Sequence, residues 1–239
     1  MNKNICNGLV AVSAMMLISG CSGTGDDVKT TAITSSKLPV LVQEALASPT
    51  STLSQELTNT LSFMGNEERL AYDVYNRLYE EWGTKQFTNI ATKSEYQHIT
   101  AVQALVQKYK LNDDVNFTNV DLPALGYITT EIEAMHAGSY DISEIQKLYD
   151  DLTAQGTTSE IEALKVGCVI EVVDVNDLDR DIELAEKENA TDIVTVFNFL
   201  RDGSYNHYWA FDKGLKNKGV NDGCCSLGSA YCHPEYPQN

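Results

Sequence analysis

The sequence predicts an all-α protein whose central part is an antiparallel four-helix bundle. Apolar residues recur at three- and four-residue spacing in four separate stretches, a period that is typical of amphipathic helices. Each stretch also carries an acidic residue or a histidine on its apolar stripe, where an unpaired charge is costly. Roughly fifty residues separate the second stretch from the third, as expected for a long crossover between two helix pairs.

The first helix is expected over residues 54–82. Its apolar stripe contains one acidic residue and consists of Leu61, Met64, Glu68, Ala71, Tyr75 and Leu78. Glu67 is adjacent to Glu68 but is turned about 100° around the helix axis. We therefore expect Glu68 to face the core and Glu67 to face solvent.

The second helix contains the motif Glu95-x-x-His98. This spacing places a carboxylate and an imidazole one turn apart on one helix face, where both can bind the same metal ion. The motif lies on an apolar stripe made of Ala91, Glu95, His98, Val102, Leu105 and Tyr109. A salt bridge within the core is the alternative explanation for a carboxylate in this position.

The third helix is expected over residues 159–187. Ser159 and Glu162 form a capping box, which gives Glu162 a structural role at the first turn. Further along, one acidic residue shares the apolar stripe, which consists of Leu164, Cys168, Glu171, Val175 and Leu178. Asp174 lies one turn after Glu171 on the same flank, so both carboxylates are candidate ligands.

The fourth helix is expected to begin with Thr191 as its N-cap and to run to about residue 215. Its stripe consists of Ile193, Phe197, Leu200, Ser204, His207 and Phe211. A single histidine on an apolar face is more often a core residue than a metal ligand. The inward carboxylates of the other three helices favour a ligand role for His207.

Between the second and third helices, Pro123 and Gly126 indicate turns and Asp141-x-x-Glu144 indicates the start of a short extra helix. His136 also lies here, and we interpret it as a surface histidine. The chain shows no internal repeat, no glycine-rich phosphate loop and no legible Ser-His-Asp constellation.

Residues 1–20 resemble a secretory signal peptide, because an apolar run follows Lys3 and is too short to span a membrane. The run ends in Leu17-Ile18-Ser19-Gly20-Cys21, which resembles a bacterial lipobox and predicts lipidation of Cys21. Residues 21–52, rich in Ser and Thr, are expected to form a flexible tether. The bundle is expected over residues 53–215. We therefore expect a lipid-anchored protein of the cell envelope, and an outer-membrane protein if the source has two membranes.

Residues 216–239 form a cysteine-rich tail. Disulfides are the default outside the cytoplasm, and the candidates are Cys224, Cys225 and Cys232. A bond between Cys225 and Cys232 is sterically easier than one between adjacent cysteines, which leaves one thiol to pair elsewhere. A zinc knot with three cysteines and a histidine is the alternative, but the Cys-x-x-Cys pair of such sites is missing.

The formal net charge of −17 disfavours nucleic acid as a partner, since phosphates would be repelled. Solubility outside the cytoplasm explains the acidic composition. An acidic surface that attracts metal cations is the second explanation.

Four helices with inward Glu, Glu-x-x-His, Glu-x-x-Asp and Ser-x-x-His resemble the ferritin-like di-iron bundle, and the rubrerythrin-type domain in particular. At finer grain the chain is similar to the uncharacterised DUF2202 family over about residues 55–213. The matching stretches are Phe63-Met64-x-x-Glu67-Glu68-x-Leu70-Ala71-x-Asp73-Val74-Tyr75, Phe87-x-Asn89-Ile90-Ala91-x-x-Ser94-Glu95-x-x-His98 and Gly203-Ser204-x-Asn206-His207.

This resemblance implies a carboxylate and histidine site for two iron or manganese ions, with zinc as an alternative. The implied ligands are Glu68, Glu95, His98, Glu171, Asp174 and His207. Tyr75 would hydrogen-bond a ligand carboxylate or a bound oxygen species. Ser204 stands where the di-iron pattern has Glu, so one carboxylate is missing.

The resemblance implies oxidation of metal or reduction of O₂ or peroxide, of ferroxidase or peroxidase type. Because the tail lacks the Cys-x-x-Cys pairs of a rubredoxin module, a reductase would need an external electron donor. The alternatives are a non-catalytic surface lipoprotein and a metal-buffering protein that retain the bundle. A homodimer also stays open.

Overall fold

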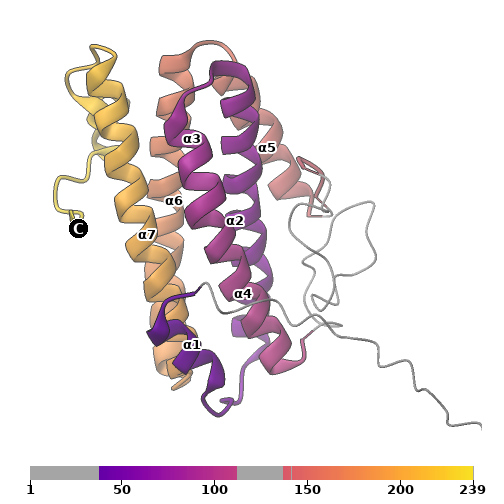
Figure 1. The fold of residues 1–239 in the computed structure, drawn as a ribbon. Helices are drawn as coiled ribbons and strands as arrows, with labels where there is room; N and C mark the ends of the chain where they lie inside the picture. The colour runs from indigo at the N-terminus through magenta and orange to yellow at the C-terminus, as the bar shows by residue number, and fades with distance from the viewer. Residues whose placement is uncertain (1–37, 112–136, 141, 239) are drawn as a thin grey trace, which may run out of the picture.

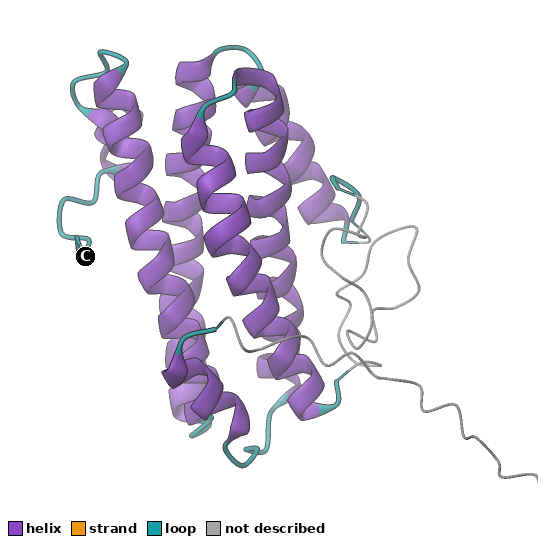
Figure 2. Cartoon of the chain, viewed as in Figure 1, coloured by secondary structure: helices purple, strands orange, loops and turns teal. Residues whose placement is uncertain are grey.

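The computed structural model describes residues 38–111, 137–140 and 142–238, and within these ranges the chain is helical and has no strand (Figures 1 and 2). Two groups of predictions lie outside these ranges. They are the expected signal peptide and lipidated Cys21, in residues 1–37, and the surface histidine His136, in residues 112–136. Among the described helices, none combines the length and the apolar character that a membrane span requires.

The first bundle helix, α2, spans Gln55–Trp82. The Ser54 hydroxyl caps its N-terminus by accepting a hydrogen bond from the Leu57 amide at 3.1 Å. Gly83 ends the helix with φ +67°, a left-handed conformation that costs glycine little.

The second bundle helix is interrupted, whereas the sequence predicts a regular one. It consists of α3 (Lys85–Ile90), a π-helical turn η2 (Ala91–Glu95) and α4 (Tyr96–Tyr109). Lys110 ends it in the left-handed region. Short π-helical turns inside α-helices occur frequently at functional sites.

The extra helix, α5 (Ser143–Gly156), packs against α2 and α6. α6 spans Glu160–Lys187, and its Ser159 cap accepts a hydrogen bond from the Glu162 amide. α7 spans Thr191–Asn217, and Ala190 rather than Thr191 is its N-cap. The reason is that the Ala190 carbonyl accepts the first helical hydrogen bond, from the Val194 amide at 3.0 Å.

The helix directions give the ferritin-like arrangement (Figure 1). α2 and α7 run one way, whereas α4 and α6 both run the other way. Two consecutive bundle helices with the same direction require a long crossover, and the connection from α4 to α6 contains α5. The predicted fold class, an all-α bundle with a crossover and an extra helix, is confirmed.

The apolar core is divided into two clusters. One surrounds Leu61, Met64 and Phe197, and the other surrounds Tyr75 and Phe211. The buried polar residue Glu68 lies between them on α2, since Met64 belongs to the first cluster and Ala71 to the second. The bundle therefore holds a polar layer between two apolar layers.

A flexible tether is predicted over residues 21–52. This prediction is wrong for residues 38–52, which the structure describes. Helix α1 (Val40–Ala47) packs against α7 and α4. Leu38 and Val42 are buried in the first cluster, which is the physical reason that this segment is ordered.

The cysteine-rich tail is also folded, with 3₁₀ turns η4 (Gly223–Leu227) and η5 (Ser229–Tyr231). Cys225 is bonded to Cys232, the pairing that steric reasoning favours, and Cys224 is bonded to Cys168 of α6. The tail is therefore tied covalently to the bundle.

Candidate metal centre

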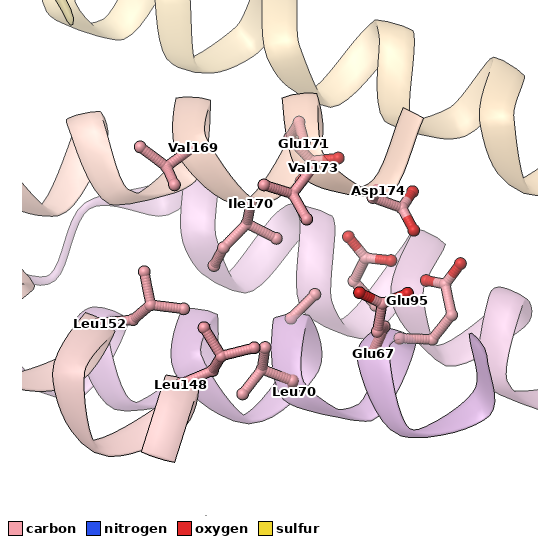
Figure 3. A pocket seen from close by; sticks show the side chains of 12 residues that line it. Glu67, Leu70, Glu95, Leu148, Leu152, Val169, Ile170, Glu171, Val173 and Asp174 are labelled. Atoms are coloured by element: carbon pink, nitrogen blue, oxygen red, sulfur yellow. The ribbon is translucent and has the colours of Figure 1, made fainter. Parts of the chain in front are cut away.

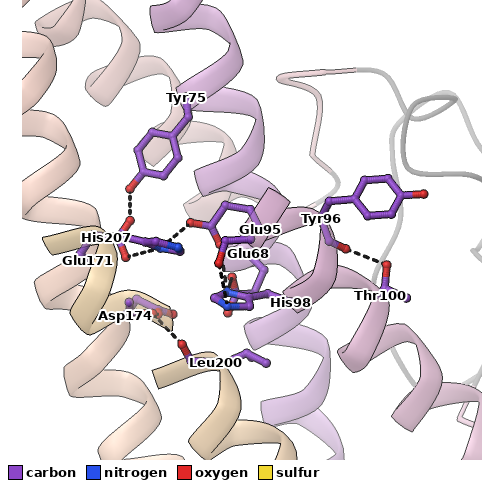
Figure 4. A network of polar contacts seen from close by, with 12 residues as sticks. Glu68, Tyr75, Glu95, Tyr96, His98, Thr100, Glu171, Asp174, Leu200 and His207 are labelled. Carbon is purple, nitrogen blue, oxygen red and sulfur yellow. Dashed lines mark hydrogen bonds and ion pairs between the residues drawn. The ribbon is translucent and has the colours of Figure 1, made fainter. Parts of the chain in front are cut away.

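The polar layer brings together candidate ligands from all four bundle helices (Figure 4). Each is buried, with no side chain more than 9% exposed. They are Glu68 on α2, Glu95 in η2, His98 on α4, Glu171 and Asp174 on α6, and His207 on α7.

The candidate ligands form two groups, and His98 belongs to the first, with Glu68 and Glu95. Its Nδ1 lies 3.0 Å from Glu68 Oε2 and 3.0 Å from Glu95 Oε2. Its Nε2 faces Ser94 Oγ at 3.5 Å. The imidazole thus directs one nitrogen at two carboxylates from different helices.

His207 belongs to the second group, with Glu95 and Glu171. Its Nδ1 lies 3.1 Å from Glu95 Oε1 and 3.2 Å from Glu171 Oε2. The rings of His98 and His207 have centroids 5.6 Å apart. Donor atoms within each three-residue group all lie within 4.8 Å of one another, so each group could hold a metal ion.

Glu95 belongs to both groups and uses a different oxygen in each. A carboxylate that offers one oxygen to each of two neighbouring sites has the geometry of a bridging ligand. The π-helical turn ends at Glu95, so the irregular backbone lies directly beside this shared residue.

The charges in this layer are strongly coupled. Burial alone would raise the pKa of Glu95, but His207 and His98 outweigh burial and lower it below its ordinary value. Burial lowers the pKa of His207, yet Glu171 and Glu95 raise it to about 10. Burial and neighbouring acids raise the pKa of Glu68 well above its ordinary value. Without metal, protons on imidazole and carboxyl groups therefore balance the negative charge.

Asp174 lies beside the two groups and belongs to neither of them. Its Oδ2 accepts a hydrogen bond from Ser204 Oγ at 2.5 Å. Burial, followed by the charge of Glu171, raises the pKa of Asp174 to about 7. Ser204 thus orients a carboxylate of α6 that lies beside the two groups.

Two further residues shape the centre. The Tyr75 hydroxyl donates a hydrogen bond to Glu171 Oε1 and leaves Oε2 for His207. Gly203 on α7 lies against the His98 ring, and a Cβ there would be 2.4 Å from Nε2. Only glycine allows α7 to approach His98 this closely. Sequence reasoning did not assign this role to Gly203.

The donor set fits a transition-metal ion of intermediate hardness. Imidazole nitrogen and carboxylate oxygen together suit iron and manganese, and zinc with fewer ligands. Glu68 Oε1 is buried and has no hydrogen-bond partner, so one donor atom of the first group is unused by the protein. An unused buried oxygen is costly unless a ligand satisfies it.

A cavity of about 60 Å³ adjoins the carboxylates between α2, α5 and α6 (Figure 3). Apolar side chains line the end opposite the carboxylates, including Leu148, Leu152 and Val169. Leu148 and Val173 are each 41% exposed. The cavity therefore has an apolar side near solvent and an acidic side at the centre.

Glu67 corrects one prediction, because it is 8% exposed and lines this cavity rather than facing solvent. Helix geometry does turn it away from Glu68, but α6 covers that side of α2.

Fold and site together define a ferritin-like helical bundle with carboxylate and histidine groups that could hold metal. The chain belongs to the family described as "Uncharacterized protein domain (DUF2202)", whose model matches residues 58–229. It is 36% identical over 173 residues to the uncharacterized protein MJ0754 of Methanocaldococcus jannaschii, covering 72% of this chain and 82% of that protein. A crystal structure of hypothetical protein MJ0754 from Methanococcus jannaschii matches with a TM-score of 0.61 and 35% identity, covering 72% of this chain and 86% of that chain.

Proposed function

We propose that this protein is a dinuclear metalloprotein that binds iron or manganese and reacts with O₂ or peroxide. The observation that carries the proposal is the division of Glu95 between two groups, each with its own histidine. Ions held in these two neighbouring groups would form a two-metal site, which can supply electrons to a bound oxidant.

The protein side chains have distinct tasks in this proposal. Glu68, His98, Glu171 and His207 bind the ions, and the carboxylates balance their charge. Tyr75 fixes the orientation of Glu171 through its hydrogen bond. Bound iron or manganese would supply the electrons for reduction of O₂ or peroxide, and an external donor would restore them.

The size and the lining of the cavity favour a small, uncharged oxidant as the reactant. Its volume of about 60 Å³ accommodates a molecule of the size of O₂ or hydrogen peroxide. Its apolar lining favours an uncharged molecule over an ion, because an ion would lose its hydration there. Asp174, with a pKa near 7, lies on the acidic side and can hold or release a proton near neutral pH.

Metal analysis of the purified protein after anaerobic loading tests the proposal. We expect two ions per chain, and His207→Ala should lose at least one of them. Absence of iron, manganese and zinc above trace after loading contradicts the proposal. So does unchanged metal binding by His207→Ala, which would identify His207 as a core histidine.

Metal buffering without turnover is the second candidate. Ser204 favours it, because a site with one carboxylate fewer is weaker for its second ion. Titration with Fe(II) under air separates the two functions. Rapid oxidation beyond two irons per chain indicates turnover, whereas binding without oxidation indicates buffering.

A non-catalytic surface lipoprotein is the third candidate. Each imidazole already pairs with two carboxylates, so ion pairs within the layer account for both histidines without a metal ion. Failure to bind metal, combined with a stable fold, would favour this candidate.

Attachment to the cell envelope through Cys21 is also proposed, on the lipobox-like sequence before that residue. Labelling of the full chain with radioactive palmitate in a bacterial host tests it. We expect label on the wild-type protein and none on Cys21→Ala.

A further inference from the structure

Glu67 is a buried carboxylate that the proposed centre does not use. Its side chain is 8% exposed, and Oε2 has no hydrogen-bond partner. The acids that act on it electrostatically are Asp174, Asp177 and Glu68. A carboxylate in such surroundings needs a proton or a cation.

A row of acids on α6 faces this part of α2. Glu171, Asp174, Asp177 and Asp181 follow one another at spacings of three or four residues, which places them along one side of the helix. Asp174 and Asp177 of this row both act electrostatically on Glu67. Within the row, Glu171, Asp174 and Asp181 are buried, whereas the Asp177 side chain is 19% exposed and reaches solvent.

Arg180 pairs with the last two acids of the row. Its Nη1 lies 2.7 Å from Asp177 Oδ1, and its Nε lies 3.4 Å from Asp181 Oδ1. The Arg180 side chain is 63% exposed, whereas that of Asp177 is 19% exposed. An exposed guanidinium can move into water at little cost, because surface ion pairs contribute little free energy.

We propose that Glu67 and Asp177 form an outer cation site through which divalent ions pass from the surface to the inner centre. The inference rests on the proposed function, since it assumes that the inner centre takes up metal. Asp174 is the next carboxylate on the way inward, and Arg180 gives up its contact with Asp177 when an ion arrives.

The donor atoms of this outer site determine which ions it prefers and how strongly it binds them. It offers carboxylate oxygens without imidazole, which suits hard divalent ions such as Mn²⁺ and Fe²⁺. Fewer and purely oxygen ligands bind more weakly than the histidine-containing groups. Weak binding is what a transit site requires, because an ion must leave it for the centre.

Co²⁺ serves as the probe, with the full-length protein under anaerobic conditions. Equilibrium dialysis counts the bound ions, and stopped-flow absorbance follows filling of the histidine-containing groups. The variants are Glu67→Gln and Asp177→Asn, which keep side-chain size and remove charge. Glu186→Gln is the matched control, since Glu186 is an exposed acid of the same helix outside the row.

We expect wild type and Glu186→Gln to bind two tight ions and a third, weaker ion. Each row variant should lose the third ion and fill the inner centre about tenfold more slowly, with unchanged affinity for the two tight ions. Asp177 is partly exposed, so Asp177→Asn provides the test if Glu67→Gln does not fold.

Two tight ions, no third ion and unchanged filling rates in the row variants would overturn the outer site alone. That result would mean that Glu67 and Asp177 share a proton. Binding of no Co²⁺ at all would overturn both the outer site and the proposed function.

Discussion

Gly203 of α7 and His98 of α4 are packed so closely that a Cβ on Gly203 would lie 2.4 Å from His98 Nε2 and 2.6 Å from Cε1. His98 also has Phe199 against it, with ring centroids 5.3 Å apart. The imidazole is therefore confined between two residues of α7, and this confinement directs Nδ1 toward Glu68 and Glu95.

Gly203→Ala should displace the His98 ring and weaken metal binding by at least about tenfold, since even indirect disturbance of a ligand costs 10–100-fold. Overpacking should also lower stability by roughly 1–3 kcal/mol. Calorimetric metal titration and thermal unfolding measure the two effects. Gly214→Ala on the same helix is the control: it meets only side-chain ends of Leu164 and Gln86, and should leave metal binding unchanged.

The shared position of Glu95 predicts an unequal effect of two otherwise similar substitutions. Glu95→Gln should weaken both bound ions, because it removes charge from both groups, whereas Glu68→Gln should weaken only the ion beside His98. We expect losses of about tenfold or more for each affected ion. Titration with Mn²⁺, followed by electron paramagnetic resonance of the free ion, measures both affinities. Glu81→Gln, at an exposed position of α2, is the control.

If Glu95→Gln and Glu68→Gln weakened the same single ion, Glu95 would not be a bridge. The centre would then be mononuclear, and the second group would be a salt bridge around His207.

The bond between Cys168 and Cys224 predicts a large effect on stability and a small one on metal binding. It closes a loop with a sequence separation of 56 residues, for which the loss of loop-closure entropy corresponds to about 4 kcal/mol. The double substitution of both cysteines by alanine should lower the free energy of unfolding by about 2–5 kcal/mol. Urea unfolding measures this change, and unchanged metal stoichiometry is expected, since neither cysteine belongs to the centre.

Removal of the Cys225–Cys232 bond is the comparison. Its sequence separation is 7 residues, so its contribution through loop closure is smaller. If removal of either bond lowered the free energy of unfolding equally, loop closure would not explain the stabilisation. Local packing of the tail would then be its cause.

Helical periodicity was sufficient to predict the parts of the centre that depend on one helix at a time. Glu68, Glu95, Glu171 and His207 each lie on an apolar stripe, and a stripe is a local property of the sequence. The expected Glu-x-x-His pair survives the π-helical turn, because the turn ends at Glu95 and leaves Glu95 and His98 on the same side.

Features that depend on contacts between helices were not predictable in this way. Glu67 faces α6 and is buried by it, although its own helix turns it away from the stripe. Cys168 is the partner of Cys224 only because the tail returns to α6. Likewise, Val42 is ordered because α1 packs on the bundle, which its Ser- and Thr-rich surroundings do not reveal.

The buried charges predict that the metal-free protein loses stability as pH rises. Asp174 has a folded pKa of about 7 against 3.8 for the ordinary group, so between these values the folded state keeps a proton that the unfolded state releases. His207 has a folded pKa of about 10 against 6.5, with the same consequence between 6.5 and 10. Each group therefore lowers the free energy of unfolding as pH rises through its window, by up to about 1.4 kcal/mol per pH unit.

Urea unfolding of the metal-free protein between pH 5 and pH 9 measures this slope, in a range chosen around the two windows. Asp174→Asn should reduce the dependence of the free energy of unfolding on pH below about pH 7. The reason is that the amide keeps a hydrogen bond to Ser204 and has no charge to bury. Metal binding should show the opposite trend and strengthen as pH rises, since each ion must displace protons from the centre. A stability that rises with pH in wild type would contradict the assignment of protons to Asp174 and His207. It would mean that depressed carboxylate pKa values such as that of Glu95 dominate the layer.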